Sequence, residues 1–311
     1  MIITICLNPA IDKTIEIRDF KVNSVNRVSA SRLDAGGKGI NVSKMIDKLG
    51  GKSTVIGVLA GSSGRFIKEQ LDLMNIENEF IFVEGETRTN IKIVDSINGF
   101  NTDINEAGPN ISDKAIDEVL DKTIVAANED TILVLAGSVP ANVSKDIYKR
   151  MIAAAKSKGA KTILDADGEL LRQGLEAGPY MIKPNIHELG VLFNKEISSP
   201  QEAIGFAKEL FSYGVEIIVI SLGSEGSVLM TKDKTLLVDG LKVEVISTVG
   251  AGDAMVASLA LAIERQYSME EAIVLATAAS AASVMTPGTS PGDLAVINKL
   301  KNRVSFKYTN C

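Results

Sequence analysis

The sequence predicts an α/β protein with a mostly parallel central sheet that is covered by helices on both faces. From about residue 111 onward, helical and strand-like stretches alternate regularly. The strand-like stretches, 131–135, 161–165, 180–183 and 216–221, are continuous apolar runs, which are typical of parallel strands buried on both faces. The chain has 311 residues and no low-complexity linker, so we expect a single domain over 1–311.

Local patterns place the remaining elements. Short apolar runs predict buried strands, and apolar residues at helical spacing predict helices. The expected strands are 1–7 and 53–59, and the expected helices are 40–49, 66–74, 113–127, 144–157 and 169–177. Two more helices precede 216–221, short strands follow residue 227, and two or three helices, including 272–285, end the chain.

Two groups of short alternating strands, near residues 14–32 and 79–105, interrupt this order. Alternation of polar and apolar residues indicates strands with one exposed face, so we predict a small separate sheet. Each group lies beside a suspected ligand loop, and a lid is therefore expected, with strands within about 12–33 and 87–106. Because exposed sheet edges need protection, we expect a homodimer through this lid sheet.

Composition excludes several classes of protein. The net charge of −6 gives no general attraction to nucleic acid or anionic membranes. No uninterrupted run of about 18 apolar residues is present, so no membrane span is expected. The two cysteines, Cys6 and Cys311, suggest neither a disulfide framework nor a zinc site. We expect a cytoplasmic protein without a leader segment.

The strongest chemical signal lies in residues 247–255, which read STVGAGDAM. A β-type run, 242–246, precedes them and an apolar helical run follows, so Gly250 and Gly252 are expected where a strand turns into a helix. The free N–H groups of a helix start form a cradle for phosphate. Asp253 is placed to accept a proton from a hydroxyl that attacks the bound phosphate. The alternative is a tight turn with Asp253 as a helix cap.

A second glycine loop occupies residues 36–42, which read GGKGINV. Gly36 and Gly37 would let the backbone approach a ligand closely. Lys38 could meet an anionic group, and Asn41 offers a donor and an acceptor to sugar hydroxyls. Three glycines in four positions are unfavourable unless something must fit there, although a flexible loop with a solvated lysine is the alternative.

Three charged residues near the predicted lid are further candidates. Asp12 follows the Asn8-Pro9 break at the end of a strand, where ligands gather in open α/β sheets. Arg27 and Arg88 lie on or beside the lid strands, and either could clamp a phosphate. A surface aspartate and solvated arginines are the alternatives.

Three loops directly after apolar strands are expected to line a nucleotide or substrate site. They contain Ser138, Lys183, Asn185, Glu188, Ser221, Gly223 and Gly226. Asn185 and Glu188 together could hold a hydrated Mg²⁺, although Glu188 could also be an ordinary first-turn helix acid. His187, the only histidine in the sequence, is most simply an exposed helix residue, so no histidine-based nucleophile is predicted.

These motifs, in this order, resemble the ribokinase-like (PfkB) carbohydrate kinase family over nearly the whole chain. The two glycine motifs, 36–42 and 248–253, carry the resemblance. Supporting matches are NPAID at 8–12, TRTN at 87–90, GSVP at 137–140, KPN at 183–185 with Glu188, and SLG at 221–223. The resemblance implies a ribokinase-like three-layer αβα sandwich with a small β-sheet lid. Within the family the chain is most similar to the phosphosugar branch, first the 1-phosphofructokinases and next the tagatose-6-phosphate kinases. Met255 departs from many relatives, but it follows the base.

The resemblance also implies a kinase that uses ATP and Mg²⁺ to phosphorylate the 6-hydroxyl of fructose 1-phosphate. Asp253 would be the base, and the N–H groups of Gly250, Ala251 and Gly252 the anion hole. The remaining assignments are Asp12, Gly36, Gly37 and Asn41 to the sugar; Arg27, Lys38, Arg88 and Ser138 to its phosphate; Lys183, Asn185 and Glu188 to ATP and Mg²⁺; and Ser221, Gly223 and Gly226 to the nucleotide pocket. The helix end is expected to keep Asp253 ionised near neutrality without unusual burial.

Three alternatives stay open. A tagatose-6-phosphate kinase differs in few contact residues. A non-catalytic sugar-phosphate sensor could share the fold, although the retained Asp253 and its glycine hole speak against it. A nicotinamide dehydrogenase is weaker, because Met255 stands where the third glycine of its fingerprint would be and residues 8–10 are not an early fingerprint.

Overall fold

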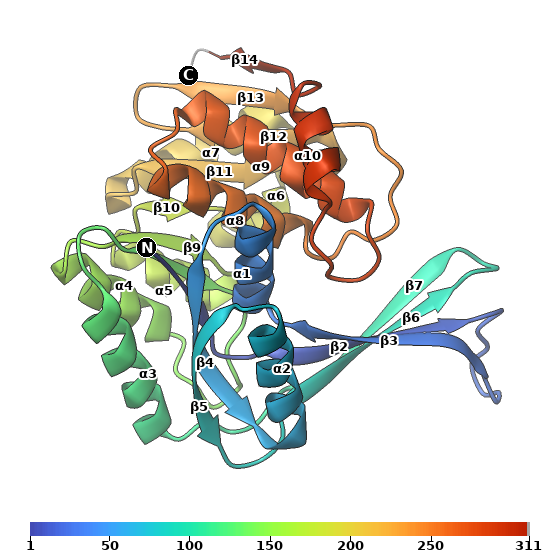
Figure 1. Cartoon of the computed structure of the whole chain (residues 1–311). Coiled ribbons are helices and arrows are strands. Elements are labelled where there is room, and N and C mark those ends of the chain that lie inside the picture. Colours follow the sequence, from blue (N-terminus) through green and yellow to red (C-terminus); the bar gives the residue numbers. More distant parts are fainter. Residues whose placement is uncertain (310–311) are drawn as a thin grey trace.

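The computed structural model describes residues 1–309, and it confirms the predicted α/β class (Figure 1). In this part of the chain, ten strands form one large sheet in the spatial order β14-β13-β12-β11-β10-β9-β8-β1-β4-β5. In this spatial order, neighbouring strands from β11 to β5 pair in parallel. The strands β11, β12, β13 and β14 pair antiparallel at one side of the sheet. The sheet is therefore mostly parallel, with an antiparallel extension.

The elements of the large sheet and its helices have the following bounds. The strands are β1 (Ile2–Cys6), β4 (Ser53–Ala60), β5 (Glu77–Val83), β8 (Ile132–Ala136), β9 (Lys161–Asp165), β10 (Met181–Ile182), β11 (Ile217–Ser221), β12 (Gly226–Met230), β13 (Thr235–Asp239) and β14 (Phe306–Tyr308). The helices are α1 (Lys38–Lys48), α2 (Gly61–Leu73), α3 (Asp113–Ala126), α4 (Ile147–Ser157), α5 (Gly168–Glu176), α6 (Ile186–Phe193), α7 (Pro200–Glu209), α8 (Ala251–Glu264), α9 (Met269–Val284) and α10 (Leu294–Lys301).

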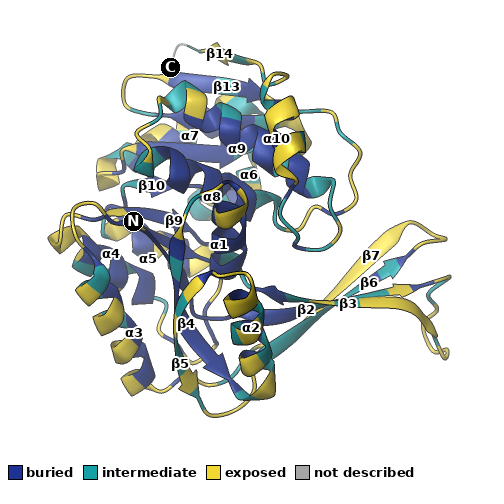
Figure 2. Ribbon diagram, viewed as in Figure 1, coloured by how far each residue is buried: buried dark blue, intermediate teal, exposed yellow. Residues whose placement is uncertain are grey.

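Helices cover both faces of the large sheet because both faces are apolar. In β1, all five residues are buried; Ile3 and Ile5 enter one hydrophobic cluster, and Ile2 enters another. One cluster packs α3, α4, α5 and α7 against the sheet, and the other packs α1, α8, α9 and α10 against the opposite face (Figure 2). A third cluster adds α2 beside α1. This gives the three-layer αβα arrangement expected from the resemblance.

A separate small sheet contains β2 (Ala10–Ile17), β3 (Val28–Gly36), β6 (Arg88–Asp95) and β7 (Phe100–Asn105) in the order β3-β2-β6-β7. Strands β2 and β6 pair in parallel, whereas β3 and β7 pair antiparallel at the edges. Figure 1 shows this sheet extending away from the body of the protein. We call it the small sheet; its base, where Ala10 pairs with Gly36 and Arg88, adjoins the body.

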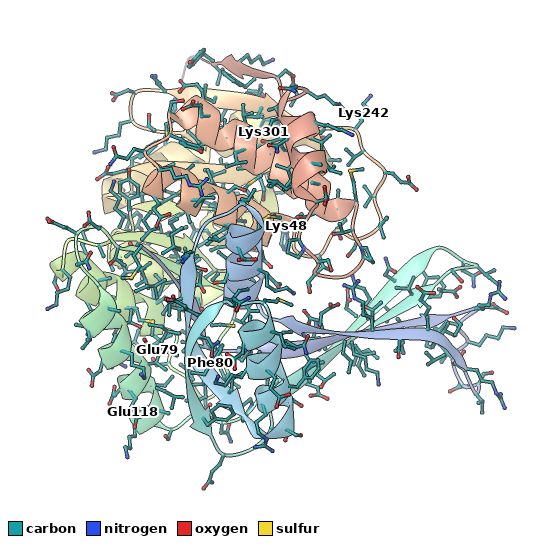
Figure 3. The ribbon with its side chains drawn as sticks, in the orientation of Figure 1. Lys48, Glu79, Phe80, Glu118, Lys242 and Lys301 are labelled. Carbon is teal, nitrogen blue, oxygen red and sulfur yellow. The ribbon has the colours of Figure 1, made fainter. Side chains whose placement is uncertain are left out.

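Part of the sequence expectation for the small sheet was wrong. Residues 79–83 belong to β5, which pairs in parallel with β4 in the large sheet. Their alternation has another cause, because β5 is an edge strand between two helices. Glu79 forms an ion pair with Lys122 of α3 at 2.9 Å, whereas Phe80 packs with the cluster that includes α2 (Figure 3).

The expectation of a strand at 242–246 is also wrong. These residues form no strand, and the edge of β13 that could have paired with such a segment is occupied by β14. The segment is held by single contacts instead: Arg303 donates to the carbonyl of Lys242 at 2.9 Å, and the N–H of Ile246 donates to the carbonyl of Val284 at 2.7 Å. The motif at 247–255 is therefore a loop that enters a helix.

Two compositional expectations bear on residues 1–309. None of the helices found there is long and apolar enough to cross a membrane. Cys6 is buried at the end of β1 and is not disulfide-bonded, as expected of a small core residue. Cys311 lies outside the described residues.

Candidate active site

Asp253 lies in the first turn of α8 and faces the second glycine loop. Gly250 occupies the N-cap position with φ 86°, and the helix begins there without a side-chain cap. Oδ2 of Asp253 accepts a hydrogen bond from Nδ2 of Asn41 in α1 at 2.9 Å. The alternative role of Asp253 as a helix cap is therefore wrong, because a glycine caps the helix and the carboxylate bonds to another element.

The expectation that Asp253 works without unusual burial is also wrong. Its side chain is 6% exposed, and burial raises the pKa of Asp253 to about 6. Lys38 and the hydrogen bond from Asn41 oppose this rise, whereas the nearby Asp165 adds to it. The carboxylate is thus poised to gain and lose a proton close to neutral pH, as suits a general base.

A buried carboxylate, Asp165, joins the lysines of two different loops. It ends β9 and is 1% exposed. Its Oδ2 lies 3.3 Å from Nζ of Lys38, and its Oδ1 lies 3.1 Å from Nζ of Lys183. Although burial opposes ionisation, the two lysines hold the pKa of Asp165 below its usual value, and Asp165 raises the pKa of Lys38. Nζ of Lys183 also lies next to the start of α8, 3.5 Å from where a Cβ would stand at Gly252.

Asp12 lies within β2 rather than at the end of a strand, contrary to expectation. Its Oδ1 accepts a hydrogen bond from Nδ2 of Asn90 in the adjacent β6 at 3.0 Å. A Cβ at Gly36 would collide with the Asp12 carboxylate. The glycine is therefore needed to make room for this side chain, whether or not a ligand approaches its backbone. Burial raises the pKa of Asp12 above its usual value.

A cavity of about 280 Å³ brings together several predicted substrate residues. Arg88 lies in its wall; its Nη2 donates to the carbonyl of Asn8 at 3.0 Å, and its Nε is buried without a partner within residues 1–309. Ser138 accepts from Nδ2 of Asn8 at 3.1 Å. The full lining is Cys6, Asn8, Lys38, Arg88, Asn90, Asn105, Ala136, Gly137, Ser138 and Asp167. Two cations and several amides make this cavity suited to a phosphorylated polyol.

An adjoining cavity of about 200 Å³ shares Asn90 and Asn105 with the first. Asp12 lines it from the small sheet, and Val249 and Thr289 line it from the body. The two cavities therefore span the base of the small sheet and the loop before α8. Asp253 itself lines neither cavity; its carboxylate is hydrogen-bonded to Asn41.

Arg27 is not brought to the other predicted residues within one chain. It is exposed and immediately precedes β3, at the distal end of the small sheet where Ile17 pairs with Val28. Gly36, at the base of the sheet, lies nine residues from Arg27, about 30 Å at the usual rise of a strand. The assignment of Arg27 to the sugar phosphate therefore stays a prediction.

Asn185 and Glu188 form a capping box at the start of α6. Oδ1 of Asn185 accepts from the N–H of Glu188, and Oε2 of Glu188 accepts from the N–H of Asn185, both at 2.8 Å. Each side chain thereby has a structural role, and one carboxylate oxygen of Glu188 is left over. No cluster of three or more His, Cys, Asp or Glu within residues 1–309 could hold a metal ion. A single oxygen fits Mg²⁺ only in the mode in which the ion keeps most of its waters.

The predicted nucleotide loops lie side by side. Ser221 forms a parallel bridge with Asn185, and its N–H donates to the carbonyl of Pro184 at 3.1 Å. Gly223 and Gly226 both have positive φ. A Cβ at Gly226 would collide with the carbonyl of Val238, so the sheet itself requires this glycine.

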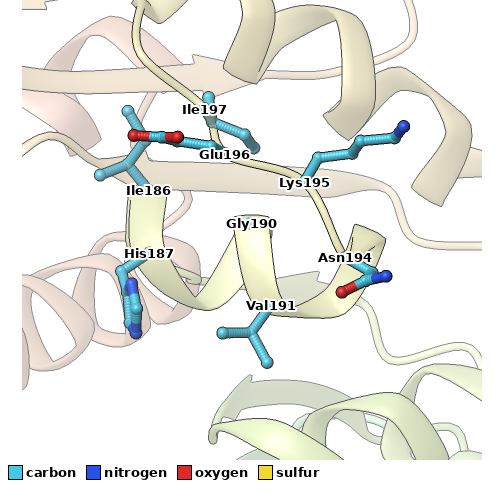
Figure 4. A pocket seen from close by; sticks show the side chains of 8 residues that line it. All are labelled: Ile186, His187, Gly190, Val191, Asn194, Lys195, Glu196 and Ile197. Atoms are coloured by element: carbon cyan, nitrogen blue, oxygen red, sulfur yellow. The ribbon is translucent and has the colours of Figure 1, made fainter.

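A larger hollow, of about 600 Å³, lies on the outer side of α6 and carries none of the predicted site residues (Figure 4). His187, Asn194 and Glu196 are among its lining. His187 is exposed, which confirms the expectation from the sequence. The smaller cavities beside Asp253 are the better candidates for the active site, because the glycine motifs and the buried lysines converge there.

The sequence interpretation missed several residues that line or organise the site. They are Asn8, Asn90, Asn105, Asp165 and Asp167. Asp165 had an available signal, since it closes a correctly predicted strand at the sheet edge where ligands gather. Asn8 and Asn90 were part of supporting motifs but had been assigned no role.

Comparisons with known proteins agree with this geometry. A model of the pfkB family of carbohydrate kinases matches residues 5–295. The chain is 36% identical over 286 residues to a 1-phosphofructokinase from Bacillus subtilis, covering 92% of this chain and 93% of that protein. It is 34% identical over 282 residues to a tagatose-6-phosphate kinase from Staphylococcus epidermidis, covering 89% and 90%.

Solved structures show the same fold. Phosphofructokinase-2 from Escherichia coli in complex with substrates and products matches with a TM-score of 0.93 and 28% identity, covering 97% of this chain and 98% of that one. Its tetrameric inhibited form matches with a TM-score of 0.90 and 27% identity, with the same coverage. Taken with the family match over most of its length, these relatives show that the chain belongs to the pfkB family of carbohydrate kinases.

Proposed function

We propose that this kinase transfers the γ-phosphoryl group of ATP to the 6-hydroxyl of fructose 1-phosphate, giving fructose 1,6-bisphosphate and ADP. The observation that carries the proposal is the convergence of Asp253, Asn41 and Lys38 beside the cavity lined by Arg88 and Ser138. An acceptor with a phosphate at one end and a hydroxyl at the other matches this arrangement. The 1-phosphofructokinase relative at 36% identity supports the choice of sugar.

In the proposed reaction, the acceptor oxygen attacks the γ-phosphorus while the bond from that phosphorus to the bridging oxygen of ADP breaks. The hydroxyl proton passes to Asp253. The N–H groups at the start of α8 (Gly250, Ala251 and Gly252) receive the charge on the transferring group. Lys183 lies beside this helix start, so it adds a positive charge there.

Asp12 would hold sugar hydroxyls through the oxygen that does not bond to Asn90. Gly37 and Asn41 complete the sugar side in the proposal. Arg88, with its unpartnered Nε, and Ser138 would bind the phosphate that the sugar already carries. Lys38 lines the same cavity and also lowers the pKa of Asp253, so its charge would act on both the phosphate and the base.

ATP would lie along the loops of Lys183, Asn185, Ser221, Gly223 and Gly226. Mg²⁺ is proposed with it, held through the free oxygen of Glu188 and bridging waters near Asn185. When bound, the ion would neutralise phosphate charge. Burial raises the pKa of Glu188, which a bound cation would offset.

A substrate panel tests the proposal. ADP release is measured with fructose 1-phosphate, tagatose 6-phosphate, fructose 6-phosphate and ribose at equal concentrations. The highest kcat/KM is expected with fructose 1-phosphate. The relative named tagatose-6-phosphate kinase makes that sugar the second candidate. Best turnover with ribose would defeat the phosphosugar assignment, and sugar-phosphate binding without turnover would indicate a sensor.

We also propose a homodimer through the small sheet. The connections at its distal end, between β2 and β3 and between β6 and β7, expose apolar side chains, among them Val22 (78% exposed), Val25 (84%) and Ile97 (65%). The variant Val25→Glu with Ile97→Glu is expected to lower the mass measured by light scattering to that of a monomer. Val125→Glu on α3, where the side chain is 86% exposed, is the control and should not change the mass.

A further inference from the structure

Arg32 of β3 reaches a loop that lies 255 residues further along the chain. Its Nη2 donates to the carbonyl of Pro287 at 2.8 Å and to Oγ of Ser290 at 3.2 Å. Its Nε donates to Oδ2 of Asp34 at 2.7 Å. A guanidinium donates in fixed directions within one plane, so these three acceptors together set its orientation. The contact joins the small sheet to the body.

The loop that Arg32 holds, residues 285–292 between α9 and α10, is compact. Oγ1 of Thr286 lies within hydrogen-bonding distance of the carbonyl oxygens of Ser283 and Ser290, at 2.8 and 2.7 Å, and its single hydrogen can be donated to either. Gly288 has φ 64°, and a Cβ there would lie 2.6 Å from Nη2 of Arg32. A glycine at this position is therefore what lets the guanidinium approach the loop so closely.

The other side of this loop backs the start of α8. Cα of Thr289 lies 3.8 Å from where a Cβ would stand at Gly250. Thr289 is 6% exposed and lines the cavity of about 200 Å³ together with Asp12 and Val249. The loop thus lies between the guanidinium of Arg32 and the backbone proposed to receive the transferring phosphoryl group.

We propose that Arg32 is a positioning residue that clamps loop 285–292 between the small sheet and Gly250. Its partner Asp34 lies directly opposite Asp12 in the register of β2 and β3. Contacts therefore run from the strand that carries Asp12, through Asp34 and Arg32, to the loop behind Gly250. The clamp keeps the sugar-binding strand and the phosphoryl-binding backbone in one relative geometry, on which phosphoryl transfer depends. The inference rests on the proposed roles of Asp12 and Gly250 but not on the identity of the sugar.

The first test compares Arg32→Ala with Arg265→Ala. Arg265 also donates to a distant backbone carbonyl, that of Gly50 at 2.9 Å, but it takes no part in the site. With the acceptor that the unaltered enzyme uses best, Arg32→Ala should lower kcat about 10- to 100-fold, with smaller changes in the KM for ATP and acceptor. Arg265→Ala should leave kcat unchanged. An unchanged kcat in Arg32→Ala, or equal losses in the two variants, would overturn the proposal.

The second test is a double-mutant cycle between Arg32 and Gly288. Gly288→Ala places a methyl group against the guanidinium and also strains the backbone at φ 64°, so only the part of its effect on kcat that is due to the guanidinium should disappear once Arg32 is alanine. If the two effects multiply instead, the clamp does not act through this contact. Thermal melts verify that each variant is folded; if Arg32→Ala is not, Arg32→Lys replaces it, with the same expected loss in kcat. If the unaltered enzyme does not phosphorylate fructose 1-phosphate, the proposed sugar is wrong. The tests of the clamp still apply, because they use the acceptor that the enzyme prefers.

Discussion

Asn41 and Asp253 meet across 212 residues of sequence, with Nδ2 of Asn41 2.9 Å from Oδ2 of Asp253. The contact joins the two glycine motifs, because α1 carries Asn41 and α8 carries Asp253. It also occupies one oxygen of the proposed base. An acceptor hydroxyl can therefore approach the other oxygen or the second lone pair of Oδ2.

Asp253→Asn should lower kcat about 10²- to 10⁴-fold, because the amide cannot accept the hydroxyl proton. ATP affinity, measured by titration calorimetry, should change little, since the nucleotide loops are separate. Near-normal turnover by this variant would remove Asp253 as the base. Asp113→Asn, at the start of the remote α3, is the control and should keep full activity.

The pH dependence of kcat/KM should report the pKa of Asp253, which burial raises to about 6. The base is active only when ionised, so activity should rise with pH through about 6 and level off above it. For a single base the slope below this point is about tenfold per pH unit. A profile that stays flat from pH 5 to 8 would contradict the assignment.

Asn41→Leu should move this acid limb to higher pH. Burial raises the pKa of Asp253 and the hydrogen bond from Asn41 lowers it, so loss of this bond should raise the pKa further. Asn90→Leu is the matched control, since Asn90 donates to Asp12 and not to Asp253. It should raise the KM for the sugar phosphate without moving the limb. Identical limbs in Asn41→Leu and the unaltered enzyme would show that the bond does not tune the base.

Burial explains which parts of the fold could be predicted from sequence. Strands β8 and β9 were expected at 131–135 and 161–165 and lie within one residue of these bounds, because continuous apolar runs mark strands buried on both faces. The run 242–246 was also expected to be a strand, yet within residues 1–309 it pairs with none, and the edge of β13 is occupied by β14 from the C-terminal part of the chain. Alternation shows that a segment suits a strand but not which partner it has.

The residues of the candidate site also fall into those that could be predicted from sequence and those that could not. Glycine loops at helix starts pointed to Asn41 and Asp253, because their backbone requirements are local. The ion pairs of Asp165 could not be predicted, since its partners Lys38 and Lys183 come from two other loops. The burial of Asp253 is likewise a property of the assembled layers, so the expectation that Asp253 works without unusual burial failed.

Asp165→Ala tests how far that buried carboxylate stabilises the protein. Removing it leaves the charge of Lys183, which is 5% exposed, without its partner, so the free energy of unfolding should fall by about 3 kcal/mol. Glu176→Ala is the control: it removes an exposed partner 2.6 Å from Lys149 and should change stability by less than about 1 kcal/mol. Both are measured by urea unfolding at pH 7.

Asp165→Ala should also change how the free energy of unfolding depends on pH, in a direction that follows from the pKa of Asp165. The lysines hold the pKa of Asp165 below its unfolded value, so its stabilising effect is complete above that value, about 3.9, and is lost as pH falls through the lower folded pKa. The stability difference between the unaltered protein and Asp165→Ala should therefore shrink only below about pH 4. Between pH 7 and 5 it should rise slightly as pH falls, because Asp165 raises the pKa of Asp253 and this repulsion is relieved when Asp253 gains its proton near pH 6. A difference that already shrinks between pH 7 and 5 would show that Asp165 is not held ionised by the two lysines, and the ion-pair account of this site would fail with it.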